Sequence, residues 1–130
     1  MSWQAYVDSS LVGSGHIDKA AIVSIAGDSA WATTAGFTLS AGEMKALADI
    51  YANPANQQKA QAEGIYIAGD RYVVAQIDDR SIYARKGRLG VCICKTKQAI
   101  LVGHHGEAMV AGNSRQTVEV LADYLIGVGY

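Results

Sequence analysis

The chain has little proline, little cysteine and no long hydrophobic run. Pro54 is the single proline, and no apolar stretch approaches the roughly 20 residues that a membrane-spanning helix needs. The N-terminal stretch has neither a basic start nor a long apolar core, so we expect no secretory signal peptide. Half of the 130 residues are hydrophobic, which is typical of a globular protein, and the length fits a single domain over residues 1–130.

The two cysteines, Cys92 and Cys94, are separated by one residue in an apparent strand. We expect their side chains to point to opposite faces of that strand, so that no disulfide joins them and both thiols stay reduced, as is usual in the cytosol. There is no C-x-x-C motif, and the histidines are not arranged around the cysteines. We therefore predict neither a metal site nor a cofactor.

Catalytic motifs are also missing. Asp78 and Asp79 are neighbours in a predicted turn, where carboxylates usually diverge and do not converge on one substrate. Ser81 has no evident base beside it, and the pair His104-His105 lacks a third metal ligand. The glycine-containing stretches G-S-G-H and K-G-R-L-G match neither nucleotide-binding fingerprint. We expect no enzymatic activity.

The net charge of −1 hides an uneven distribution. One segment carries seven of the eleven cationic residues and only two carboxylates, a local charge of +5 against −6 for the rest. The seven are Arg71, Arg80, Arg85, Lys86, Arg88, Lys95 and Lys97. Such a segment predicts a basic surface for an acidic protein face or an anionic lipid head group. The alternative is that these residues only keep strand faces and edges soluble.

Both ends of the chain have the pattern of a helix. In the first, from Met1 to Val12, Ser2 can act as the N-cap, and the apolar residues at helical spacing are Trp3, Tyr6, Val7 and Leu11. In the last, from Asn113 to Tyr130, Asn113 and Gln116 form a capping-box pattern and Gly127 suits a C-cap. Its buried face is predicted to comprise Val118, Leu121, Ala122 and Leu125.

Between these ends the periodicity changes from helix to strand. Ser40 and Glu43 form a second capping box, which predicts a helix that stops at Asn53-Pro54, and a short surface helix follows over residues 55–63. Strand-like runs cover residues 20–26, 29–33, 65–68, 71–77, 81–85, 90–94 and 99–103. The short links between the later runs predict an antiparallel meander, and residues 104–112 are predicted to form a loop.

These elements indicate an α+β fold. We predict a central antiparallel β-sheet of about six or seven strands. The N- and C-terminal helices should cover one face of this sheet, and the short middle helices should cover the other.

Five aromatic residues come from three separate parts of the chain: Trp3, Tyr6, Trp31, Tyr124 and Tyr130. One interpretation places these rings in the core. The other is that the terminal helices pack side by side and that the rings form a shared apolar shelf. Parallel rings with polar tips suit a proline-rich peptide, because polyproline II is already stiff and the ring donors reach its free carbonyls.

The chain resembles the profilin family. It opens M-S-W-Q-A-Y-V-D, carries A-G-D-S-A-W-A-T around Trp31 and D-D-R-S-I-Y from Asp78 to Tyr83, and ends L-A-D-Y-L-I-G-V-G-Y. The resemblance spans the whole chain without large gaps. In its compact length the chain is similar to the profilins of fungi, amoebae and other unicellular eukaryotes.

The resemblance implies a protein of the cytoplasm and cytoskeleton that regulates actin polymerisation and has no nucleic-acid partner. It implies one-to-one binding of monomeric actin, binding of proline-rich proteins such as formins, and binding of phosphatidylinositol phosphates at the membrane surface. The five aromatic residues match the family's polyproline positions. The implied actin positions are Arg71, Val73, Val74, Tyr83, Arg85, Lys86, Arg88, Gly112, Asn113, Arg115 and Glu119. The implied phosphoinositide positions are Arg71, Arg80, Arg85, Lys86 and Arg88.

One position departs from the family pattern, because Gln76-Ile77 stands where many relatives carry an arginine before D-D-R. An alternative function is that of a small-ligand sensor domain, since sheets flanked by helices also enclose pockets. This alternative predicts a ligand-sized cavity between the sheet and the helices, lined by the aromatic residues.

Overall fold

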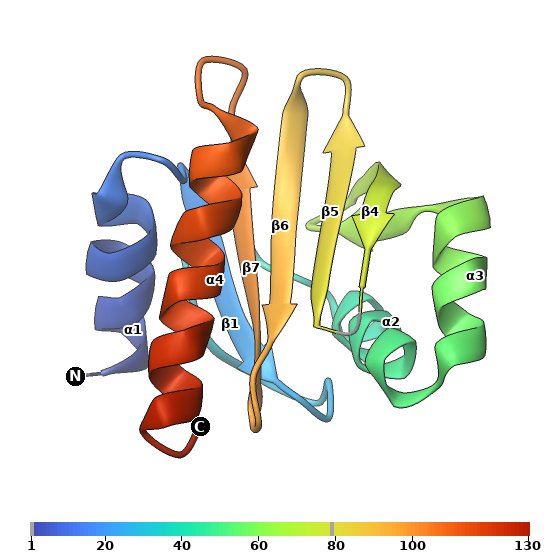
Figure 1. The fold of residues 1–130 in the computed structure, drawn as a ribbon, viewed down its shortest axis with the longest axis horizontal. Helices are drawn as coiled ribbons and strands as arrows, with labels where there is room; N and C mark the ends of the chain where they lie inside the picture. Colours follow the sequence, from blue (N-terminus) through green and yellow to red (C-terminus); the bar gives the residue numbers. More distant parts are fainter. Residues whose placement is uncertain (1, 79) are drawn as a thin grey trace.

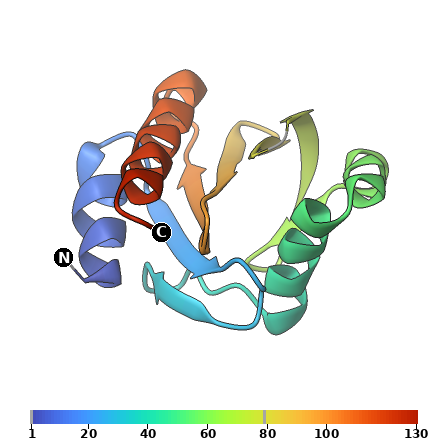
Figure 2. The ribbon, with the colours of Figure 1, turned by 60° about the horizontal axis from the view of Figure 1, so that its bottom comes forward.

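Seven antiparallel strands form one curled sheet in the order β2-β1-β7-β6-β5-β4-β3 (Figures 1 and 2). The computed structural model describes residues 2–78 and 80–130. Met1, at the start of the predicted first helix, and Asp79, the second carboxylate of the predicted turn, lie outside the described residues.

The element bounds follow the predicted runs closely. The helical elements are α1 (Trp3–Ala5), the π-helical η1 (Tyr6–Leu11), the 3-10 turn η2 (Val12–Ser14), α2 (Ala41–Ala52), α3 (Pro54–Glu63) and α4 (Ala111–Gly127). The strands are β1 (Lys19–Ser24), β2 (Ala30–Thr33), β3 (Ile65–Ile67), β4 (Asp70–Ile77), β5 (Ser81–Lys86), β6 (Leu89–Lys95) and β7 (Ala99–His105). The predicted loop over residues 104–112 is shorter than expected, because β7 continues through both histidines.

Two apolar layers cover the two faces of the sheet. On one face the N-terminal helical segment and α4 lie side by side, and their buried residues, such as Leu11 and Leu125, pack on Ile22 and Leu101 (Figure 1). On the other face α2 and α3 cover a second cluster that includes Leu47. The predicted α+β class and the predicted distribution of helices over the two faces are confirmed.

The first strand, β1, joins two parts of the sheet, and the sequence pattern did not predict this pairing. β1 pairs with its neighbour β2, and it also pairs with β7 near the other end of the chain, with Lys19 opposite His104. The remaining strands form the predicted meander from β3 to β7. Because β1 joins the two parts, β2 and the terminal helices lie at the same end of the sheet (Figure 2).

The N-terminal helix is correct in place but wrong in type. The Ser2 hydroxyl accepts the Ala5 N–H at 3.1 Å, as predicted for an N-cap. Only one α-helical turn follows, and η1 then continues with wider π-helical turns. Val7 and Leu11 are fully buried in this segment and belong to the apolar cluster beneath α4.

Both predicted ends of the C-terminal helix were misplaced. The helix begins at Ala111 with Val110 as its N-cap, because the Ser114 N–H already donates to the Val110 carbonyl at 3.1 Å. Asn113 is therefore inside the first turn and does not cap the helix. At the other end Gly127 is the last helical residue, and Gly129, with φ of 98°, takes the left-handed conformation instead.

The capping box at the start of α2 is confirmed. The Ser40 hydroxyl accepts the Glu43 N–H, and the Glu43 carboxylate accepts the Ser40 N–H at 2.8 Å. The same carboxylate also accepts the N–H groups of Ala68 and Gly69, so it ties the helix to the β3–β4 turn. Asn53 ends α2, and its side chain caps α3.

The expectation that Cys92 and Cys94 point to opposite faces was wrong. Side chains alternate along a strand with a period of two, so residues separated by one position share a face. Both thiols are free and buried on the α4 side, where Cys92 Sγ lies 3.7 Å from Ser114 Oγ and Cys94 Sγ lies 3.7 Å from Ser81 Oγ. Burial raises the pKa of Cys92 to about 11, so this thiol is unreactive near neutral pH.

Candidate functional site

The five aromatic residues singled out from the sequence form one continuous group, the aromatic cluster: Trp3, Tyr6, Trp31, Tyr124 and Tyr130. Trp3 is at its centre, with its ring centroid 4.7 Å from that of Trp31, 5.0 Å from Tyr130 and 5.6 Å from Tyr6. Tyr124 extends the cluster, with its ring centroid 6.2 Å from that of Tyr6. Three parts of the chain that are far apart in sequence therefore contribute to one surface.

Local hydrogen bonds hold the ends of the chain at this surface. The Ser2 cap fixes the turn that carries Trp3. At the other end, the Tyr130 N–H donates to the Leu125 carbonyl at 2.8 Å, and the Tyr130 carbonyl accepts the Thr96 hydroxyl at 2.7 Å. The last residue is thus bound to the β6–β7 turn, and the cluster is pre-organised.

The cluster is a surface and not a buried core. Tyr124 is 54% exposed and Tyr130 is 42% exposed, whereas Trp3, Tyr6 and Trp31 are half-buried. The interpretation of Trp3 and Tyr6 as core residues is met only in part, because both pack against the buried cluster beneath them without being buried in it. The rings are also tilted by 45° to 84° at their contacts with Trp3, where the sequence argument expected parallel rings.

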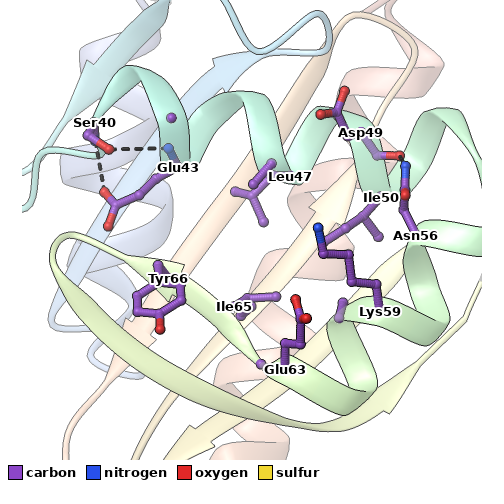
Figure 3. A pocket seen from close by; sticks show the side chains of 14 residues that line it. Ser40, Glu43, Leu47, Asp49, Ile50, Asn56, Lys59, Glu63, Ile65 and Tyr66 are labelled. Atoms are coloured by element: carbon purple, nitrogen blue, oxygen red, sulfur yellow. Dashed lines mark hydrogen bonds between the residues drawn. The ribbon is translucent and has the colours of Figure 1, made fainter.

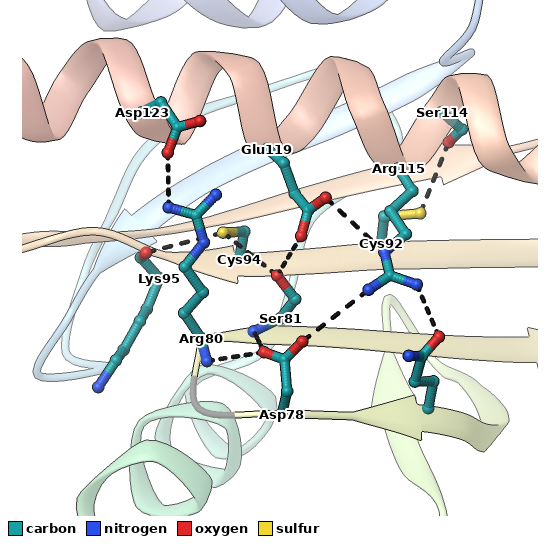
Figure 4. A network of polar contacts seen from close by, with 11 residues as sticks. Asp78, Arg80, Ser81, Cys92, Cys94, Lys95, Ser114, Arg115, Glu119 and Asp123 are labelled. Carbon is teal, nitrogen blue, oxygen red and sulfur yellow. Dashed lines mark hydrogen bonds and ion pairs between the residues drawn. The ribbon is translucent and has the colours of Figure 1, made fainter.

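A second surface, between α4 and the β4–β5 region, is polar (Figure 4). Three α4 side chains reach the β4–β5 region: Asp123 accepts from Arg80 at 2.7 Å, Glu119 accepts from Ser81 at 2.7 Å, and Arg115 donates to Gln76 at 2.6 Å. We call these residues the polar network. It fixes the orientation of α4 on the sheet.

Asp78 extends the polar network at the turn after β4. Its carboxylate accepts the N–H groups of Arg80 at 3.0 Å and Ser81 at 2.8 Å, and it lies 3.9 Å from the Arg115 guanidinium. Partial burial opposes ionisation, but these N–H groups and cations outweigh it and lower the pKa of Asp78. The carboxylate is therefore a fixed negative charge at this turn.

Five of the predicted actin positions share the α4 side of the sheet. Val73 lies opposite Arg85 in the β4–β5 pair, and Tyr83 lies two residues before Arg85 on the same face. Arg115 and Glu119 face the same region from α4 (Figure 4). Val73 is 53% exposed, so an apolar side chain is accessible to solvent beside these charged side chains.

The other predicted actin positions are more dispersed. Val74 packs on the core of the opposite face, and Lys86 forms an ion pair with Asp70 at 2.7 Å. Arg71 donates to the Glu63 carbonyl, and Arg88 forms an ion pair with Glu107 at 2.6 Å. Gly112 and Asn113 are exposed in the first turn of α4.

Four of the five predicted phosphoinositide positions lie at the same end of the β4–β5 pair but not on one face of the sheet. Arg71, Arg85, Lys86 and Arg88 lie toward the β5–β6 turn, and Arg85 and Lys86, which are consecutive in β5, point to opposite faces. Arg80 precedes β5 at its opposite end, and the six residues of β5 span roughly 20 Å. A single lipid head group therefore cannot contact all five.

His105 is a feature of the α4 side that sequence analysis missed. It lies opposite Gly90, which lies opposite Arg85, so the three form a row across β7, β6 and β5. The His105 ring occupies the space above Gly90 and lies parallel to the Tyr83 ring, 7° between planes and 6.0 Å between centroids. The sequence signal that could have indicated this arrangement is Gly90, because a strand residue without a side chain leaves room for the ring of the residue opposite.

We expect His105 to make the fold less stable in weak acid. Its ring is 4% exposed, and Nδ1 has no hydrogen-bond partner among the described residues. Burial above all, and also His104 and Arg85, lower the pKa of His105 below its ordinary value. The unfolded chain then binds the proton first, so stability is complete above pH ~6.5 and falls as the pH drops below it.

Urea unfolding at pH 7.5 and 5.5 measures this effect while the carboxylates remain ionised. His105→Phe, which keeps a flat ring beside Tyr83, should lose less stability between the two pH values than the unaltered chain. Equal losses would assign the acid sensitivity to other groups.

A separate pocket of about 550 Å³ lies on the opposite face, between α2, α3 and β3 (Figure 3). Its floor includes Leu47, Ile50 and Ile65. Tyr66 is the one aromatic residue among the described residues that line it. The small-ligand alternative required a pocket lined by the aromatic cluster, and this pocket does not meet that requirement.

Within residues 2–78 and 80–130, no three His, Cys, Asp or Glu side chains are grouped so that they could hold a metal ion. Among the helices described for the same residues, none combines the length and the apolar character needed to cross a membrane.

Comparison with known proteins agrees with the geometry. The profile of the family described as "Profilin" matches residues 1–130. The chain is similar to the profilin of Schizosaccharomyces pombe, at 48% identity over the full length of both chains. A crystal structure of that profilin has a TM-score of 0.94 at 47% identity, over 99% of this chain and 100% of that chain. Mouse profilin IIa, in complex with a double repeat from the FH1 domain of mDia1, shares the fold with a TM-score of 0.82 at 20% identity, over the whole of both chains.

Proposed function

This chain belongs to the profilin family of non-enzymatic, actin-monomer-binding regulators of polymerisation, and from this premise we propose that it holds an actin monomer and a proline-rich segment at the same time. The observation that carries the proposal is that α4 contributes to two surfaces: Tyr124 contacts Tyr6 in the exposed aromatic cluster, whereas the polar network of α4 contacts the β4–β5 region (Figure 4). The aromatic cluster and the proposed actin site then share no side chain.

The aromatic cluster is the proposed proline-rich site, with all five rings in contact with the peptide. Polyproline II has no internal hydrogen bonds, so its carbonyls are free to accept from indole N–H and tyrosine O–H groups. Partial burial and the contact with Tyr124 raise the pKa of Tyr6, which keeps its hydroxyl protonated as a donor. The mouse protein bound to an FH1 repeat makes formins reasonable partners for this site.

The actin site is proposed on the α4 side of β4 and β5. Val73, Tyr83, Arg85, Arg115 and Glu119 supply an apolar patch with charges around it, which suits a protein interface. Gly112 and Asn113, at the start of α4, are placed at its border. Arg71, Val74, Lys86 and Arg88 are assigned to the same site, and each would have to leave its present contact to reach actin, because each packs or pairs elsewhere in the free protein.

Regulation follows from holding both ligands. A sequestered monomer cannot nucleate filaments, while a tether that binds the aromatic cluster raises the local concentration of actin at a growing barbed end. A phosphoinositide site at Arg71, Arg85, Lys86 and Arg88 would compete with actin for the same cations, with Arg80 contributing at a distance. This competition should weaken as salt screens it. We place the protein in the cytoplasm, at the cytoskeleton.

Two titrations test the proposal. Trp3 and Trp31 both belong to the aromatic cluster, so a polyproline peptide should change the intrinsic tryptophan fluorescence to a saturating value. A scrambled peptide without proline is the control and should leave the signal unchanged. In parallel, the protein should reduce the filament yield of pyrene-labelled actin in proportion to its concentration. Failure of the first titration removes the proline-rich site, and failure of the second removes the actin site.

A further inference from the structure

A groove continues from the aromatic cluster along the boundary between the N-terminal helical segment and α4. Its volume is about 550 Å³, and Tyr6 and Tyr124 of the cluster stand at one end of it. Val120 and Leu121 supply apolar surface further along. The groove and the cluster therefore share two rings and form one continuous surface.

The other end of the groove is lined by uncharged polar side chains: Ser10, His16, Asn113, Gln116 and Thr117. The Thr117 hydroxyl is already used, since it donates to the Asn113 carbonyl at 2.8 Å. Within residues 2–78 and 80–130, the side-chain amides of Asn113 and Gln116 form no hydrogen bond. These two amides are donors available to a ligand.

We propose that this groove binds the uncharged continuation of the proline-rich segment, beyond the residues that contact the aromatic cluster. The inference rests on the proposed proline-rich site and extends it. No Asp, Glu, Lys or Arg is among the described lining residues, so a charged ligand would lose hydration without gaining a partner. An extended peptide presents one carbonyl per residue, which the two amides can bind.

The dimensions agree with a short extension. Eleven residues of α4 separate Tyr124 from Asn113, which is roughly 16 Å along the helix axis. A polyproline II chain rises about 3.1 Å per residue, so about five additional residues cover the groove. A peptide that contacts only the aromatic cluster leaves the amides unused.

A length comparison tests the proposal. A proline octamer is compared with the same octamer carrying a five-residue Ala-Ser-Ala-Ser-Ala extension at either its N- or its C-terminus, and binding is measured by calorimetry. We expect one of the two extended peptides to bind about fivefold more tightly, corresponding to about 1 kcal/mol. The same extension with Glu in place of Ser should lose this gain.

Matched variants identify the groove as the cause. Gln116→Ala should remove most of the gain and leave the affinity for the plain octamer unchanged. Gln58→Ala makes the same chemical change at an exposed position on α3 and should preserve both affinities.

Three other outcomes would overturn the inference. Equal affinities for the octamer and both extended peptides mean that the groove is not used, although the proline-rich site stands. A gain that survives in Gln116→Ala, or that survives with Glu in the extension, means that the extra contacts lie elsewhere. If neither the octamer nor a longer polyproline binds, the proposed proline-rich function itself fails, and this inference fails with it.

Discussion

Trp3→Ala should reduce the affinity for a polyproline peptide by about 2 kcal/mol or more, which is roughly thirtyfold. Trp3 is the ring that contacts Tyr6, Trp31 and Tyr130, so its loss divides the aromatic cluster into separate pieces. A large, central and half-buried tryptophan is the residue type most often responsible for the affinity of an interface. The loss should therefore exceed that of any single peripheral ring.

The fluorescence of Trp31 remains as the probe in this variant, and calorimetry gives an independent affinity. Tyr66→Ala is the control, because it removes an exposed aromatic ring that lines the pocket on the opposite face. Thermal unfolding of the variant distinguishes a loss of peptide binding at the cluster from a loss of stability of the whole fold. If the Trp3 variant is folded and binds normally, the cluster does not form the proline-rich site.

Arg85→Glu should weaken actin sequestration about tenfold or more while leaving polyproline binding intact. Arg85 lies on the α4 side between Val73 and Gly90 in the strand register, and no ion pair is found for it among the described residues. A free cation near the centre of the proposed actin site can pair with a carboxylate of the partner, and reversing its charge turns this attraction into repulsion. The aromatic cluster shares no side chain with the proposed actin site and should be unaffected.

Sequestration is measured from the filament yield of pyrene-labelled actin at several concentrations of the variant. Lys45→Glu reverses an exposed charge on α2 and is the control for a change in net charge. Sequestration that is unchanged in Arg85→Glu would argue against this placement of the actin site. Loss of polyproline binding in the same variant would instead indicate that the two sites are coupled through α4.

Several features of this protein are readable from short stretches of sequence. The side chains of Ser40 and Glu43 each accept the backbone N–H of the other residue within one helical turn. The start of α2 therefore needs no distant partner and was predicted correctly. The strands of the meander were found because their apolar runs end at Gly, Asp and Lys turns. Helical spacing identified Trp3 and Tyr6, and the family resemblance identified the full set of five aromatic residues.

Other features depend on contacts between residues that are distant in sequence. Trp31 reaches Trp3 only because β1 pairs with β7 and places β2 beside the terminal helices. A register irregularity between Val74 and Gln76 puts Gln76 opposite Tyr83 and within reach of Arg115. A shift of one residue moves a side chain to the other face of a sheet, and no local pattern shows where such a shift occurs.

The sequence by itself thus determined which side chains are available: an aromatic set, a basic segment and two helical ends. Tertiary structure decided how they are grouped. It assembled the aromatic cluster and opened the groove beside it, and it separated Arg80 and Lys95 from Arg71, Arg85, Lys86 and Arg88 by the length of β5. The physical reason is that caps and periodicity act within a few residues, whereas strand register and helix packing are settled by the burial of the whole core.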